Sequence, residues 1–158
     1  MILEDLIDYA KIIGPLLTGA SILLSAIYFI ANIKRDRTKQ TLDYWEKINQ
    51  ELKTEKRKLQ RDYGDKIDTD LARLILEDKE ERIRLNRVIN IYERLAVGIN
   101  LKVYDIRVLN RVVGQNIINN YNRYENYILE RREKLDRPFA WKDFQTLSMK
   151  LQRLRKRI

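Results

Sequence analysis

The feature that most constrains this chain is an uncharged apolar run near its N-terminus. Residues 12–33 read IIGPLLTGASILLSAIYFIANI and contain no Asp, Glu, Lys or Arg. As a helix rising about 1.5 Å per residue, this run spans roughly the 30 Å hydrocarbon layer of a bilayer. A core helix of a small soluble protein is rarely apolar on every side over such a length. The run therefore predicts a single transmembrane helix.

The flanks of the run distinguish a retained anchor from a cleaved signal peptide and predict its orientation. The residues before it are acidic, whereas a signal peptide begins with positive charge and has a shorter apolar core. Only Lys11 precedes the run as a basic residue, and four basic residues follow it: Lys34, Arg35, Arg37 and Lys39. Basic flanks stay in the cytoplasm. We therefore expect an anchor in the cytoplasmic (inner) membrane, with residues 1–11 outside and the C-terminal part in the cytoplasm.

Small and polar side chains lie on one face of the predicted membrane helix. They recur at intervals of three, four and seven residues: Gly14, Thr18, Ser21, Ser25 and Asn32. Small residues let two helices approach closely in lipid, and this heptad-like spacing is that of a left-handed helix pair. We expect the face to mediate self-association into a homo-oligomer. A stripe that lines a pore has the same signature, so a membrane-perturbing effector is an alternative.

Several kinds of chemistry are excluded by what the chain lacks. It has no Cys and no His, which removes disulfides, thiolate zinc sites and His-dependent catalysis. Its five Gly residues are too scattered for a phosphate-binding loop. We therefore expect no catalytic residues, no metal and no cofactor, and the chain is predicted not to be an enzyme.

The segment after the membrane run carries a narrow apolar seam among charged residues. Neither Pro nor Gly occurs between Ile33 and Gly64, so the membrane helix is expected to continue into an amphipathic rod over residues 34–62. Apolar residues recur there at intervals of three, four and seven: Trp45, Ile48, Leu52 and Leu59. Such a seam fits a coiled coil. It fits equally well an ordinary amphipathic helix within one domain.

Residues 63–158 are predicted to form a small cytoplasmic helical bundle. Gly64 marks a break, and Asp68 and Asp105 are suited to cap the helices that follow them. Gly114 is expected to bend or interrupt the helix after Asp105. A last amphipathic helix carries four apolar residues: Phe144, Leu147, Leu151 and Leu154. Because no long stretch alternates with period two, the predicted fold class is all-α, with the membrane helix and rod preceding the bundle.

The run from Val88 to Ile99, VINIYERLAVGI, is followed by Tyr104-Asp105 and an aromatic-rich helix. In these motifs, and in outline over nearly the whole chain, the sequence resembles an uncharacterised family of small membrane-anchored prokaryotic and phage proteins, classed as a domain of unknown function. The resemblance implies the architecture, and it brings no established activity or catalytic residue. It also implies an accessory, phage-related or antiviral-defence setting. Members usually place a glycine in the turn before the aspartate, where this chain has Asn-Leu-Lys-Val at residues 100–103.

The run from Val88 to Ile99 and the following Tyr104-Asp105, which we call the signature, offer one candidate polar site. Its residues are Asn90, Glu93, Gly98 and Asp105. Asn90 and Glu93 lie one helical turn apart beside the apolar face, where Glu93 could serve as a base or a ligand. A single carboxylate without His, Cys or a second acid is poor catalytic equipment. We therefore interpret the pair as groups that hydrogen-bond a neighbouring helix or loop and fix the register of the bundle.

Positive charge is concentrated toward the C-terminus. The formal net charge is +9, and the excess ends in Lys150, Arg153, Arg155, Lys156 and Arg157. These residues could be attracted to anionic membrane lipid. They could instead contact nucleic acid beside a stacking face of tyrosines among asparagines: Tyr121, Tyr124 and Tyr127. The nucleic-acid interpretation is less favoured, because two of these tyrosines also fit the apolar core stripe.

The sequence thus predicts a membrane-anchored, self-associating helical protein that tethers or senses at the membrane. Its cytoplasmic part is expected to present a surface to an unidentified protein partner. A membrane-tethered nucleic-acid binder and a membrane-perturbing effector are the alternatives.

Overall fold

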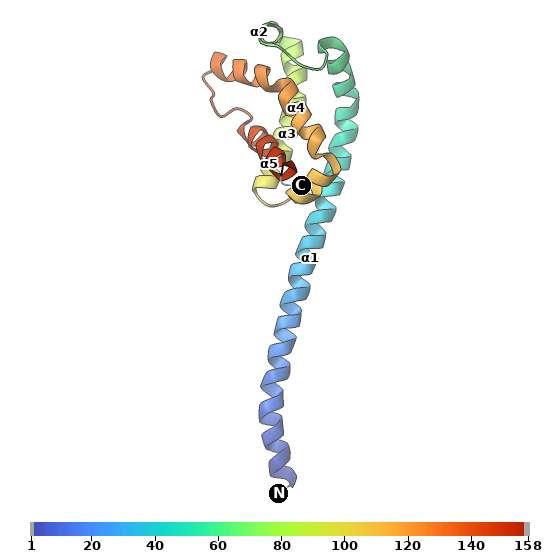
Figure 1. Cartoon of the computed structure of the whole chain (residues 1–158), viewed down its shortest axis with the longest axis vertical. Coiled ribbons are helices and arrows are strands. Elements are labelled where there is room, and N and C mark those ends of the chain that lie inside the picture. Colours follow the sequence, from blue (N-terminus) through green and yellow to red (C-terminus); the bar gives the residue numbers. More distant parts are fainter. Residues whose placement is uncertain (1, 157–158) are drawn as a thin grey trace. The chain divides into compact units, whose positions relative to one another are not determined.

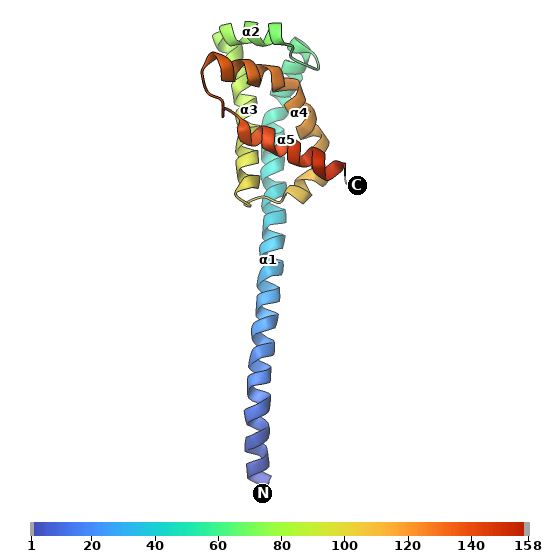
Figure 2. The ribbon, with the colours of Figure 1, turned by 60° about the vertical axis from the view of Figure 1, so that its left-hand side comes forward.

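The computed structural model describes the backbone of residues 2–156 and the side chains of residues 13–156. This part of the chain contains helices and no strand (Figures 1 and 2), which confirms the all-α prediction. In chain order the helices are α1 (Ile2–Tyr63), α2 (Thr69–Glu77), α3 (Lys79–Asn100), α4 (Ile106–Lys134) and α5 (Lys142–Arg155). The chain divides into two compact units, Met1–Arg37 and Thr38–Ile158, which we call the N-terminal unit and the folded unit.

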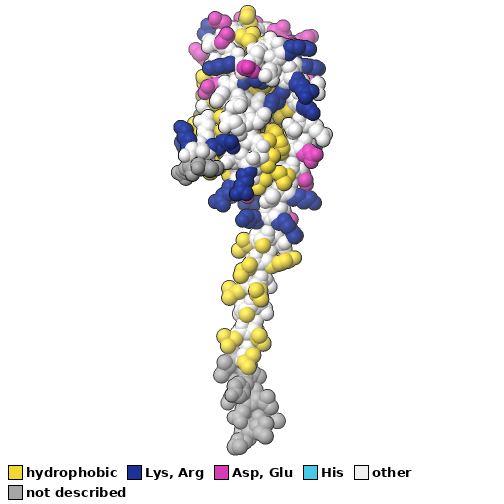
Figure 3. Space-filling model, turned by 45° about the vertical axis from the view of Figure 1, so that its right-hand side comes forward, with side chains coloured by type: hydrophobic (Ala, Val, Ile, Leu, Met, Phe, Trp, Pro, Cys, Tyr) yellow, Lys and Arg dark blue, Asp and Glu magenta, His cyan; other side chains and the backbone are white. Residues whose placement is uncertain are grey.

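The N-terminal unit is a stretch of α1 whose apolar side chains are uncovered. Leu16 is 68% exposed and Phe29 is 65% exposed. Figure 3 shows apolar side chains along the described part of the apolar run and Lys and Arg side chains where the run ends. The helix is long and apolar enough to cross a membrane, with a mean hydropathy of 1.9 in its most apolar window. The expected outer segment 1–11 belongs to the same helix from Ile2 on, and its side chains lie outside the described residues.

The remainder of α1 is built into the folded unit. Its seam residues are all buried: Trp45, Ile48, Leu52 and Leu59. They belong to one apolar cluster together with buried residues of the four later helices. The seam is thus buried within the chain itself, as in the alternative of an ordinary amphipathic helix. For the same reason the folded unit begins at Thr38, whereas we expected a separate rod over residues 34–62 and a bundle over 63–158.

The helix ends fall where the sequence predicts them. α1 stops before Gly64, which takes a left-handed φ of 71° and donates its N–H to the carbonyl of Gln60. Asp68 accepts the N–H of Leu71 at the start of α2, and Asp105 accepts the N–H of Arg107 at the start of α4. Carboxylates in these positions satisfy N–H groups that have no partner inside the helix. These contacts confirm Gly64 as a break and both aspartates as caps.

The prediction of an interruption at Gly114 is wrong, because α4 is continuous from Ile106 to Lys134. Gly114 instead makes room between helices. A Cβ atom there would lie 2.4 Å from Oδ1 of Asn110 and 3.3 Å from Nη1 of Arg155. Arg155 crosses from α5 at this point and donates to the carbonyl of Asn110 over 3.1 Å. The glycine therefore permits a close helix contact rather than a turn.

Aromatic packing joins α5 to the core of the folded unit. The ring of Phe144 stacks on Tyr92 with centroids 4.8 Å apart, and Tyr121 meets it edge-on at 5.3 Å. All three side chains are buried. Such ring pairs add to the free energy of burial by about 0.5–1.5 kcal/mol each. This cluster fixes the start of α5 against α3 and α4, which is where the signature residues lie.

Candidate interaction surfaces and the signature cluster

Glu93 caps the N-terminus of α5 from the neighbouring helix α3. The residue before α5, Trp141, has a left-handed φ of 53° and makes no side-chain capping bond of its own. One carboxylate oxygen of Glu93 accepts the N–H of Asp143 at 3.3 Å, and the other accepts the N–H of Phe144 at 2.7 Å. Both N–H groups are among those that a helix leaves without internal partners, and a negative charge is favoured at this end of a helix.

Asn90 completes this contact one turn earlier on α3. Its Oδ1 accepts the indole N–H of Trp141 at 2.7 Å. Burial raises the pKa of Glu93, while the N–H groups of Phe144 and Asp143 act in the opposite direction. Both oxygens of the carboxylate are engaged by backbone N–H groups, so the geometry uses Glu93 to hold α5 and not to abstract a proton.

Gly98 and Asp105 build the turn between α3 and α4. The carbonyl of Gly98 accepts the N–H groups of Val103 and Tyr104, at 2.9 and 3.2 Å. A Cβ atom on Gly98 would lie 2.3 Å from the Tyr104 ring, so only glycine leaves room for that ring. Asp105 donates its N–H to Oγ1 of the buried Thr41 on α1 at 2.8 Å.

Residues 100–103 form this turn without a glycine. Lys102 has a left-handed φ of 60°, a conformation that glycine adopts at no steric cost. Two further hydrogen bonds hold the turn: the N–H of Leu101 donates to the Val97 carbonyl, and the N–H of Lys102 donates to the Ile99 carbonyl. The next ring, Tyr104, stacks on Tyr44 of α1 with centroids 4.7 Å apart. We did not predict these contacts of the turn. The sequence signal for them was the pair of apolar residues, Leu101 and Val103, on either side of Lys102.

The small-residue stripe lies on the uncovered N-terminal unit. Three of its hydroxyl groups donate to carbonyls one turn earlier in the same helix, at 2.8–2.9 Å: Thr18 to Gly14, Ser21 to Leu17, and Ser25 to Ser21. Nothing lies within 4 Å of a Cβ placed on Gly14. Asn32, the last member, is partly covered. All three hydroxyls are therefore hydrogen-bonded within their own helix.

The basic C-terminal residues divide into two kinds. Lys150 donates to Oδ1 of Asn100 at 2.7 Å, and Arg155 contacts Asn110, so both of them join α5 to other helices. Arg153 and Lys156 are exposed to solvent. Arg157 lies outside the described residues.

The burial of three tyrosines on α4 contradicts the less favoured alternative of a stacking face for nucleic-acid bases. Its tyrosines are 0–4% exposed because they pack in the core: Tyr121, Tyr124 and Tyr127. Tyr127 also donates its hydroxyl to Oδ1 of Asn86 at 2.7 Å. Two asparagines of the same helix are occupied as well: Asn126 donates to the carbonyl of Ile67, and Asn116 accepts from Lys56. The rings therefore have no face to offer to a base.

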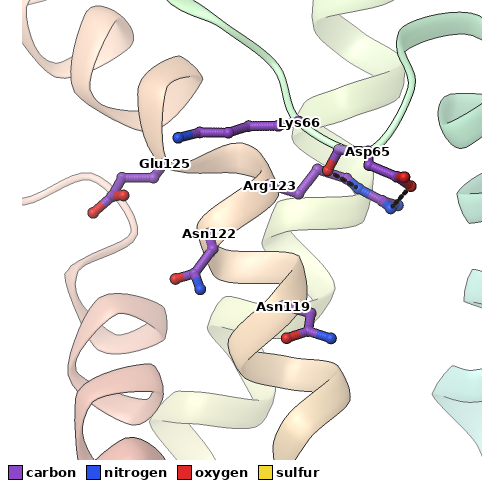
Figure 4. A pocket seen from close by; sticks show the side chains of 6 residues that line it. All are labelled: Asp65, Lys66, Asn119, Asn122, Arg123 and Glu125. Atoms are coloured by element: carbon purple, nitrogen blue, oxygen red, sulfur yellow. Dashed lines mark hydrogen bonds and ion pairs between the residues drawn. The ribbon is translucent and has the colours of Figure 1, made fainter.

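A shallow polar depression lies between α4 and the connection from α1 to α2 (Figure 4). Its lining residues are Asp65, Lys66, Asn119, Asn122, Arg123 and Glu125. Figure 4 shows Arg123 directed at Asp65, and it donates there to the backbone carbonyl at 3.0 Å and to the carboxylate at 3.1 Å. The carbonyl of Arg123 also accepts the N–H of Ile67. The strongest polar groups of this depression thus hold the connection in place.

These features define a class of protein: an all-α chain with one helix long and apolar enough to cross a membrane, followed by a small packed helical unit. The chain belongs to the family described as Domain of unknown function (DUF4760), which matches residues 15–151. This match confirms the resemblance to an uncharacterised family. No match was found among curated proteins or among solved structures.

Proposed function

We propose that this protein is a single-pass membrane anchor that self-associates through its membrane helix and holds a helical binding unit in the cytoplasm. One observation carries the proposal. The apolar side chains of the N-terminal unit are about two-thirds exposed, such as Leu24 at 67%, whereas those of the folded unit form a buried core. A large uncovered apolar surface is stable in lipid and costly in water.

The charges beside the span support the proposed orientation. Basic residues follow it directly, from Lys34 to Lys39, and acidic residues dominate the segment before it. The positive-inside bias then keeps the folded unit in the cytoplasm and leaves residues 1–11 outside.

The mode of action that we propose is binding rather than catalysis. The signature carboxylate of Glu93 caps a helix, and the polar groups of the depression at Asp65 hold a chain connection. We propose that the exposed surface of the folded unit binds a cytoplasmic protein and keeps it near the membrane. The resemblance supports a phage-related or antiviral-defence setting for this tether.

Self-association is proposed to use the small-residue stripe by close packing. Thr18, Ser21 and Ser25 have small side chains, so they add little volume to a helix contact. Their hydroxyls are hydrogen-bonded within their own helix, so they need no polar group on the partner helix. A leucine on this face would hold two helices apart, since small residues set how closely helices approach in lipid. Ser25 and Ala26 are neighbours that differ in face, because successive helical residues are turned by about 100°.

This difference provides a matched experiment. The full-length protein is cross-linked in native membranes, and the attached chains are identified by mass spectrometry. We expect Ser25→Leu to reduce the self-linked product strongly and Ala26→Leu to leave it close to wild type. Equal yields for all three proteins would contradict the proposed interface. Recovery of the wild-type protein in the supernatant without detergent would contradict the anchor itself.

A further inference from the structure

The α3–α4 turn holds two apolar side chains out of the folded unit. Leu101 is 71% exposed and Val103 is 44% exposed, and the cation of Lys102 lies between them in the chain. Leu101 is the most exposed large apolar residue among the described residues of the folded unit. The turn lies at the opposite end of this unit from α2 (Figures 1 and 2).

The turn is firmly held. The carbonyl of Gly98 accepts two N–H groups, Tyr104 stacks on Tyr44, and the N–H of Asp105 bonds to Thr41. These contacts tie the turn to α1 on one side and to both of its own helices on the other. The apolar side chains are therefore presented in a fixed position and do not fold back onto the core.

The charges around the turn favour an anionic surface. Lys102, Arg107 and Arg111 are all exposed. The one acid in this stretch, Asp105, accepts the N–H of Arg107 as a helix cap. Apolar side chains flanked by cations are typical of segments that enter the interface of an anionic bilayer.

The chain keeps this turn within reach of a membrane. Thr41, which bonds the turn, is eight residues from Ile33 at the end of the apolar run, and even a fully extended chain of that length spans only about 29 Å. A protein partner fits the turn less well, because a stable protein interface buries about 800 Å² on each side. A tip with two apolar side chains is small for such an interface, and it suits insertion among lipid headgroups.

We infer that the α3–α4 turn is a second membrane contact, in which Leu101 and Val103 enter the headgroup region of an anionic bilayer and Lys102 and Arg107 bind its lipid phosphates. This inference rests on the proposed anchor. It assigns the turn the role of fixing the folded unit against the membrane surface at two points.

The absence of cysteine makes the test direct. Single cysteines are placed in the full-length chain at Leu101 and, separately, at Val103, Leu74 and Leu23, and each is labelled with an environment-sensitive fluorophore. The proteins are reconstituted into vesicles of phosphatidylcholine with phosphatidylglycerol. Leu74 on α2 is 64% exposed and serves as the aqueous control, while Leu23 in the apolar run reports the anchor.

We expect the labels at 101 and 103 to emit at shorter wavelength than the label at 74. Lipid-borne quencher should quench them more than aqueous iodide does. Lys102→Glu combined with Arg107→Glu should shift the emission at 101 toward that of 74, and vesicles of phosphatidylcholine alone should do the same. The emission at 74 should not change with either.

The outcomes separate this inference from the proposed function. If the label at 23 reports lipid while those at 101 and 103 match the aqueous control, the second contact is overturned and the anchor stands. If the label at 23 is itself aqueous, the anchor fails. The label at 101 could report lipid without any change in emission when the anionic lipid is left out or both glutamates are introduced. That result would overturn the role of Lys102 and Arg107.

Discussion

At the scale of single residues, Gly98 is the position where one added methyl group has the clearest consequence. The Cβ of Gly98→Ala would overlap the Tyr104 ring, which is stacked on Tyr44. Displacing that ring should lower the free energy of unfolding by about 1–3 kcal/mol, the usual cost of overpacking. Thermal unfolding in detergent, followed by circular dichroism, measures the loss.

A second variant separates this overlap from a general helix effect. In a Tyr104→Ala background the ring is gone, and Gly98→Ala should be neutral or stabilise by up to about 1 kcal/mol through helix propensity. The two substitutions should therefore be strongly non-additive. Equal losses in both backgrounds would show that the ring does not explain the glycine.

Lys56 gives the folded unit a pH dependence of known sign. Its Nζ donates to Asn116 at 3.0 Å, and burial, with a smaller contribution from the charge of Arg123, lowers the pKa of Lys56 from 10.5 to about 8. Between these two values the unfolded chain keeps a proton that the folded chain has lost. The free energy of unfolding should therefore rise with pH through this window.

The comparison with Lys56→Met tests this sign. Wild type should gain stability relative to Lys56→Met as the pH rises from about 8 to 10.5, the window between the two pKa values. Lys53→Met removes an exposed lysine but retains Lys56, and it should therefore keep this rise with pH. Because burial raises the pKa of Tyr127 to about 12, the stability of every variant falls as the pH rises past the ordinary tyrosine value near 10. This loss is common to wild type and Lys56→Met and therefore cancels in the comparison. Parallel curves for wild type and Lys56→Met would contradict the lowered pKa.

At the scale of elements, the apolar seam of α1 belongs to the core of its own chain. Leu52 is 1% exposed and Leu42, on the same helix, is 41% exposed. Leu52→Ala should cost about 2–5 kcal/mol of unfolding free energy, and Leu42→Ala should cost less than about 0.5 kcal/mol. The loss at Leu52 should be the same at all protein concentrations. A loss that vanishes on dilution would indicate that the seam packs between chains.

The elements show what periodicity and turn chemistry can predict. Gly64, Asp68 and Asp105 marked helix ends because a left-handed glycine and capping carboxylates act over a few neighbouring residues. The seam of α1 was visible, but its partner was not, since a narrow apolar stripe fits a second chain as well as the same one. The interruption predicted at Gly114 is wrong because the sequence does not distinguish a glycine that interrupts a helix from one that makes room for neighbouring side chains, here Asn110 and Arg155.

The candidate sites were predictable to the same degree. Asn90 and Glu93 stood out as polar residues beside an apolar face. We predicted a hydrogen-bonding role for them rather than a catalytic one, because the chain has no His and no Cys. That Glu93 caps α5 depends on a contact 50 residues away in the chain, which no local pattern encodes. Tyr121 and Tyr124 fitted both a core stripe and a stacking face, and only their burial decides between these.

At the scale of the whole molecule, the two units of the chain differ in how much apolar surface they expose. The N-terminal unit keeps its apolar side chains uncovered, and the folded unit buries its own. We propose that lipid surrounds the N-terminal unit and water surrounds the folded unit. In this proposal, the charge asymmetry of the flanks determines which side of the membrane holds the folded unit.

Labelling of single cysteines in sealed spheroplasts tests this claim most directly. Glu4→Cys lies before the apolar run, and Leu74→Cys lies on an exposed position of the folded unit. The account predicts that a membrane-impermeant maleimide modifies the cysteine at 4 in intact spheroplasts and the one at 74 only after the membrane is opened. Modification at 74 in intact spheroplasts, with 4 protected, would contradict it.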